Sequence, residues 1–179
     1  MASPLSPLGV VHTALSLAPI VAGLYSYVRH RAIEPATPSG KVYLVGLVLS
    51  VLTAFGLSST GGFNPGHAVG IVALLAVIGG LLAPRLAFLG RLRPYAAAFG
   101  MSFSFFLLLV PGIAETLTRL PAAHPLADGP QSPWVRVALL SWVVIFLVGI
   151  VLQGWAIRSR RHGTTPHQAD DAPPLAHRP

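Results

Sequence analysis

Cysteine is absent from the chain. Disulfide bonds, thiolate metal sites and cysteine nucleophiles are therefore excluded. The sequence also contains no P-loop, no dinucleotide-binding glycine fingerprint, no GxSxG nucleophile elbow and no HExxH zinc motif. These absences give no support to nucleotide use or hydrolysis, and they favour a protein that is not an enzyme.

Charged residues are scarce, at 9% of 179 residues, whereas 53% are hydrophobic. Soluble domains carry about 25% charged residues, so lipid must cover much of this surface. The net charge of +7 comes from basic residues that flank apolar runs, which predicts membrane contact and not nucleic-acid binding. Eleven Arg against one Lys, with many Ala, Gly and Pro, are typical of a GC-rich bacterial genome. We therefore predict the bacterial cytoplasmic membrane.

Five apolar runs are long enough to cross a bilayer as helices, which takes about 20 residues each. The predicted fold is an all-α integral membrane protein, with one five-helix transmembrane bundle over residues 1–157. The Pro-rich polar tail, residues 158–179, is expected to be disordered and cytoplasmic. The predicted spans run from Leu8 to Val28, Val42 to Thr60, Gly66 to Ala83, Tyr95 to Thr118, and Val137 to Ile157.

Basic residues in the connections predict the orientation, because cytoplasmic loops are enriched in Lys and Arg. With five spans, the loop after the first span, the loop after the third span and the C-terminal tail share one side of the membrane. These three segments hold nearly all of the basic residues. Only Arg119 and Arg136 fall on the other side. We therefore predict an N-terminus outside and a C-terminus in the cytoplasm. The basic residues on the predicted inner side are Arg29, Arg31, Lys41, Arg85, Arg91, Arg93, Arg158, Arg160, Arg161 and Arg178.

A candidate polar site follows from the stretch "GGFNPGHAVGIVALL". Asn64 is a favoured N-cap and Pro65 suits a first helical position, so His67 lies in the first turn of the third span. His12 lies in the first span and Glu115 in the fourth, both near the predicted outer surface. Ionisable residues inside spans are rare and usually face a cavity or partner.

Each of these residues also has a plain structural interpretation. Glu115 and Arg119 are spaced i, i+4, as in an ordinary helix ion pair. His67 can cap its helix, and His12 has Ser16 one turn away. We nevertheless predict that His12 and His67 face the bundle, because an unpaired imidazole in hydrocarbon costs several kcal/mol. His67 is then expected within direct or one-water reach of His12 or Glu115.

Residues 12–121 resemble small, uncharacterised bacterial membrane proteins with a few helices and scattered His residues. The similar segments are "HTALSLAPIVAGL", "GKVYLVGLVLS", "GGFNPGHAVGIVALL" and "YAAAFGMSFSFFLLLVPGIAETLTRLP". The His-Arg pair of those proteins is replaced here by Gly40 and Lys41. There is also a faint likeness to transmembrane b-type cytochromes, which implies that His12 and His67 could pair on haem.

Three functional hypotheses remain open from the sequence. The first is a non-enzymatic helper or assembly subunit in the lipid bilayer, with a membrane-protein partner or a homo-oligomer. The second is a small transporter or proton-coupled carrier in which Glu115 titrates. The third is a redox protein that binds haem or a divalent metal through His12 and His67, residue types that suit zinc, copper or iron.

Overall fold

The computed structural model describes residues 7–56, 62–121 and 123–162. Within these ranges the chain forms helices only, five of which are long and apolar enough to cross a membrane. They are α1 (Pro7–His30), α2 (Pro38–Gly56), α3 (Pro65–Leu82), α4 (Arg93–Arg119) and α5 (Pro133–His162). Two short 3-10 helices, η1 (Ala83–Arg85) and η2 (Ala87–Leu92), join α3 to α4. The expected all-α class with five membrane-span-like helices is confirmed.

Proline marks the start of each long helix. Pro7, Pro38, Pro65 and Pro133 are first residues of their helices, and Pro94 is the second residue of α4. Proline suits these positions because its fixed φ fits a helix and its missing N–H is not needed in the first turn. The local sequence therefore sets where each crossing begins.

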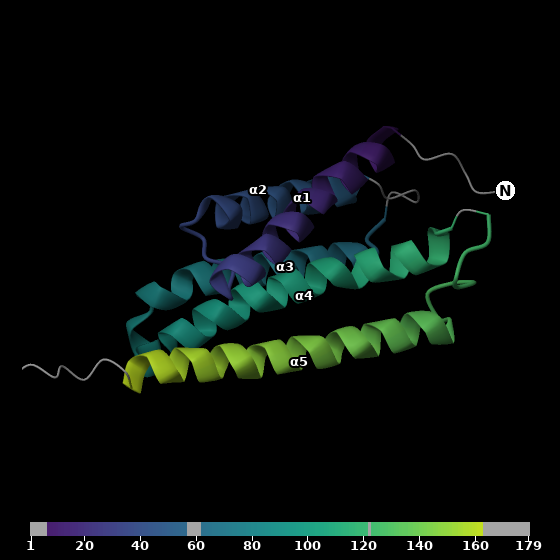
Figure 1. The fold of residues 1–179 in the computed structure, drawn as a ribbon. Helices are drawn as coiled ribbons and strands as arrows, with labels where there is room; N and C mark the ends of the chain where they lie inside the picture. Colours follow the sequence, from purple (N-terminus) through teal and green to yellow (C-terminus); the bar gives the residue numbers. More distant parts are fainter. Residues whose placement is uncertain (1–6, 57–61, 122, 163–179) are drawn as a thin grey trace, which may run out of the picture.

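The helices are arranged as two pairs with a fifth helix at the side (Figure 1). The first pair is α1 with α2, the second is α3 with α4, and α5 packs along α4. The start of α1 and the end of α5 lie at opposite ends of the bundle. We call the end at which α1, α3 and α5 finish the basic end, because Arg29, Arg85, Arg93 and Arg158 lie there.

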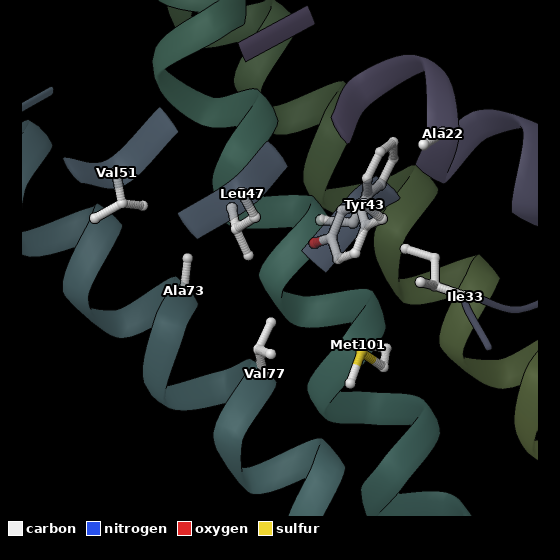
Figure 2. Packing of buried hydrophobic residues seen from close by; sticks show 9 residues of the cluster. Ala22, Ile33, Tyr43, Leu47, Val51, Ala73, Val77 and Met101 are labelled. Atoms are coloured by element: carbon white, nitrogen blue, oxygen red, sulfur yellow. The ribbon is translucent and has the colours of Figure 1, made fainter. Parts of the chain in front are cut away.

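A buried core lies between α1, α2, α3 and α4. Figure 2 shows Leu47 and Val51 of α2 close to Ala73 and Val77 of α3, with Tyr43 farther along α2. Glycine permits this close packing at Gly100 of α4, where an added Cβ would lie 2.6 Å from a backbone carbonyl oxygen of α3. Small residues of this kind let membrane helices approach closely.

α5 is the most peripheral helix of the bundle. In its most apolar stretch only 6% of the residues are buried inside the protein, whereas the corresponding share is 33% for α2 and for α4. It also continues beyond the predicted end at Ile157, as far as His162. The remainder of the predicted disordered tail, residues 163–179, lies outside the described residues.

Candidate functional site

His12 contacts α2 from the first part of α1. Its Nδ1 atom is 2.9 Å from the Thr53 hydroxyl, and its Nε2 atom is 3.4 Å from the Ser16 hydroxyl. The side chain is neither fully buried nor fully exposed. The imidazole thus faces a neighbouring helix, as predicted, and finds hydroxyl partners there.

A short row of hydroxyls extends this contact along the interface of α1 and α2. The hydroxyls of Ser16 and Ser50 are 2.6 Å apart. Thr53 donates to the backbone carbonyls of Leu49 and Ser50 in its own helix, which leaves its oxygen lone pairs for His12. We call His12, Ser16, Ser50 and Thr53 the hydroxyl row. The hydroxyl row joins α1 to α2 by side-chain hydrogen bonds, in the part of the bundle opposite the basic end.

His67 serves as part of the cap of α3. The Asn64 side chain accepts a hydrogen bond from the His67 backbone N–H at 3.1 Å, and the Asn64 backbone N–H donates to His67 Nδ1 at 3.3 Å. This reciprocal arrangement is a capping box, usually made with Glu or Gln at the third helical position. The predicted N-cap at Asn64 and first position at Pro65 are confirmed.

The ring of His67 is buried, with 4% of the residue exposed. It stacks on Phe55 with ring centroids 4.5 Å apart, and Phe63 meets its edge at 5.8 Å. Its Nε2 atom is 3.2 Å from the Ala54 carbonyl oxygen near the end of α2. A ring nitrogen that donates to this carbonyl leaves Nδ1 as the acceptor for the Asn64 N–H. The capping contacts thus favour one neutral tautomer.

Glu115 and Arg119 form an ion pair on the outside of α4. The Arg119 Nε atom lies 2.5 Å from the Glu115 carboxylate, and the two side chains are 62% and 58% exposed respectively. This is the plain i, i+4 pair that the spacing allowed.

His12 and His67 both contact α2 near its C-terminal end, but they bond to different residues. His12 contacts the Thr53 side chain, whereas His67 contacts the Ala54 carbonyl and the Phe55 ring. No hydrogen bond within the described residues joins His67 to His12 or to Glu115. In the same part of the chain, no group of three or more His, Asp or Glu side chains could hold a metal ion.

Sequence reasoning missed a second polar cluster, which lies toward the basic end. Ser102 of α4 donates to the Gln153 Oε1 atom of α5 at 2.8 Å, and the Gln153 amide donates to the Arg31 carbonyl at 3.3 Å. Tyr27 of α1 interacts with both Ser102 and Gln153. We call Tyr27, Ser102 and Gln153 the amide cluster. The isolated Gln153 within the apolar run of the fifth span was the signal that could have revealed it.

A third polar contact lies in the core itself. The Tyr43 hydroxyl is 2.7 Å from the Ser104 hydroxyl, and Ser104 donates to the Met101 carbonyl. Both side chains are fully buried. Every buried side-chain nitrogen or oxygen in the described residues has a hydrogen-bond partner, so these polar groups stabilise specific helix contacts.

No protein family, curated protein sequence or solved structure matches the chain. The resemblance to small bacterial membrane proteins and to b-type cytochromes therefore stays a prediction from the quoted segments. The described helices, by their length and apolar composition, indicate a multi-pass membrane protein in contact with a lipid bilayer.

Proposed function

We propose that this protein is a non-enzymatic membrane subunit that helps another integral membrane protein to assemble or function. The observation that carries this proposal is the position of α5. This helix of 30 residues packs along α4, and only 6% of the residues in its most apolar stretch are buried inside the protein. It therefore presents most of its length to lipid or to a partner helix.

The pairing of the polar side chains supports the same proposal. The hydroxyl row and the Tyr43–Ser104 contact are both satisfied inside the bundle. In a membrane, such bonds hold helices together because lipid offers no alternative partner. They explain the polar residues of α1 and α2 as structural groups of a scaffold.

The transporter hypothesis is weaker in this fold. Its titrating group, Glu115, is ion-paired and more than half exposed on the surface of α4. Binding sites of secondary transporters typically lie near the bilayer midplane and use discontinuous helices. Proteoliposome flux that is lost in Glu115→Gln would nonetheless restore this hypothesis.

The haem or metal hypothesis keeps His12 and His67 as its ligands. The one observation in favour of this hypothesis is that His12 and His67 both contact α2 near its C-terminal end. The purified protein should therefore show no Soret absorbance. A Soret band that disappears in His12→Ala and His67→Ala would replace the helper assignment with a redox one.

We further propose that the basic end faces the cytoplasm of a bacterium. The absence of cysteine allows a direct test by single-cysteine variants. Gln131→Cys, between α4 and α5, should react with an impermeant maleimide in intact spheroplasts. Phe88→Cys, between α3 and α4, should react only after lysis. The reverse pattern would overturn the orientation.

The helper function is testable with a photocrosslinker attached to one cysteine in native membranes. Val148 of α5 and Val45 of α2 are 52% and 59% exposed, which makes them a matched pair. Val148→Cys should give one discrete heavier product containing a second membrane protein, and Val45→Cys should give none. A bare monomer from both positions, or a product that contains this chain alone, would contradict the proposal.

A further inference from the structure

A cavity lies between α1, α4 and α5 at the level of the amide cluster. Its volume is about 260 Å³. Leu24 of α1 and Ile145 of α5 line it, and these residues are 51% and 57% exposed. The cavity is therefore open to the side of the bundle, which in a membrane-spanning chain faces lipid. A molecule that occupies it must be lipid-soluble and must enter from the bilayer.

The walls of this cavity are rich in aromatic rings. Phe106 and Trp142 stack with an interplanar angle of 12°, and Phe106 and Phe146 have ring centroids 4.7 Å apart. Phe105 lines the same space and meets Trp142 edge to face. Aromatic faces pair favourably with another planar ring, beyond the area that they bury. A flexible acyl chain also buries apolar area here, but it has no ring face to pair with these aromatic side chains.

The polar side of the cavity is uncharged. Ser102 uses its hydrogen on Gln153, and Gln153 uses one amide hydrogen on the Arg31 carbonyl. The second amide hydrogen of Gln153 remains to serve a further acceptor, and the Tyr27 hydroxyl lies beside it. The left-handed conformation of Arg31, with φ of 61°, ends α1 at this point and sets the position of that carbonyl.

The chemistry of the lining argues against an anionic head. None of the described residues that line the cavity carries a charge. Arg31 contacts Gln153 only through its backbone carbonyl and is an exposed residue, and Arg158 is five positions beyond Gln153 along α5, or about 7.5 Å by helical rise. A charged group placed beside the amide cluster would lose its hydration without an opposite charge in contact.

The geometry points to a lipid-soluble quinone as the occupant of this cavity. Its planar ring lies against the cluster of Phe106, Trp142 and Phe146, and a ring carbonyl accepts from Gln153 beside the Tyr27 hydroxyl. Its isoprenoid tail leaves through the lateral opening past Leu24 and Ile145. This binding site goes beyond the helper function and does not depend on the identity of the partner.

Tryptophan fluorescence gives a direct test, because Trp142 lines the cavity. The full chain in detergent is titrated with a short-chain ubiquinone analogue, and saturable quenching is expected. Trp142→Phe should remove the saturable component, since Trp134 and Trp155 lie elsewhere and are largely exposed. Quenching that rises linearly without saturation would show simple partition into the micelle and would overturn the proposal.

Two glycines of α5 provide matched variants. A Cβ added at Gly149 or at Gly154 would meet no atom within 4 Å, so both positions accept a larger residue. Only Gly149 lines the cavity. Gly149→Leu should weaken quinone binding about tenfold or more, which corresponds to about 1.4 kcal/mol. Gly154→Leu should leave the affinity unchanged, and equal effects of the two variants would contradict the assignment.

The Tyr27→Phe variant tests the polar contact alone, because it does not change how much of the cavity is filled by side chains. Tyr27→Phe keeps the ring and removes only the hydroxyl, so we expect weaker quinone binding with unchanged helix content. Phosphatidylglycerol and diacylglycerol are added as competitors. Displacement of the quinone by either lipid at equal concentration would assign the cavity to ordinary lipid.

Discussion

The α1–α2 contact and the α4–α5 contact of this protein are formed by different side chains. Hydroxyl groups and His12 of the hydroxyl row join α1 to α2 by hydrogen bonds. Between α4 and α5, Phe106 lies against both Trp142 and Phe146. Two hydrogen bonds add to these rings, from Ser102 to Gln153 and from Trp142 Nε1 to the Phe106 carbonyl. The α1–α2 contact is therefore polar, whereas the α4–α5 contact is mainly aromatic and forms the wall of a cavity.

The largest expected effect concerns backbone approach in the first pair. A Cβ at Gly46 would lie 2.7 Å from the ring of Pro19 in α1. Gly46→Leu should therefore lower the free energy of unfolding by about 3 kcal/mol, the upper part of the range for overpacking. The control is Gly154→Leu on α5, which should change it by less than about 0.5 kcal/mol. Circular dichroism during titration from mild detergent into SDS measures both.

If Gly46→Leu and Gly154→Leu unfold at the same SDS fraction, α1 and α2 are not held in the close contact described. The distinction between the close α1–α2 contact and the α4–α5 contact would then fail.

The next effect concerns the rings between α4 and α5. Phe106→Leu keeps an apolar side chain but removes three ring contacts, with Trp142 and Phe146 of α5 and with Phe103 of α4. Aromatic pairs contribute about 0.5–1.5 kcal/mol each beyond buried area, so a total loss of about 1.5 kcal/mol is expected. Phe88→Leu is the control, because Phe88 is 83% exposed. A loss as small as that of the control would show that α5 is held by other contacts.

A smaller effect is expected from the hydroxyl row. Ser50→Ala removes the bond to Ser16 across α1 and α2. Hydrogen bonds between membrane helices average about 0.6 kcal/mol and reach about 1.7, so we expect a loss of about 1 kcal/mol. Ser159→Ala, whose hydroxyl bonds only to its own helix, should cost less. The same unfolding titration ranks the two, and an equal cost would remove the row from the comparison.

The smallest effect is expected at the exposed ion pair of α4. Glu115→Gln should change the free energy of unfolding by about 0.5 kcal/mol or less, as for other exposed pairs. Added salt should reduce even that difference, because it screens exposed charges. A loss above about 1 kcal/mol that persists in high salt would give Glu115 a role beyond this pair.

Hydropathy and helix-start signals were sufficient to predict most of the fold. Run length predicted five helices of membrane-spanning size, because a crossing needs continuous apolar residues. Asn64 and Pro65 predicted the start of α3 correctly, since capping is a local property of the chain. These features depend on neighbouring residues, and a single sequence contains that information.

The candidate site was harder to predict. Span order gave the depth of His12, His67 and Glu115, but not the direction in which each side chain points around its helix. His67 turns to the Ala54 carbonyl and caps its own helix, and no direct hydrogen bond joins it to His12 or Glu115 within the described residues. The rotation of a helix is set by packing against its neighbours, and a single sequence does not record that packing.

The position of α5 has a consequence for biogenesis. The buried core cluster consists of residues between Ala22 and Phe105, and α5 supplies none of them. A ribosome releases α1 to α4 before α5, so the inner packing of the bundle can form while α5 is still being made. We therefore expect α5 to pack against α4 after the inner helices have associated, and its insertion to complete the cavity wall as a late step of membrane integration.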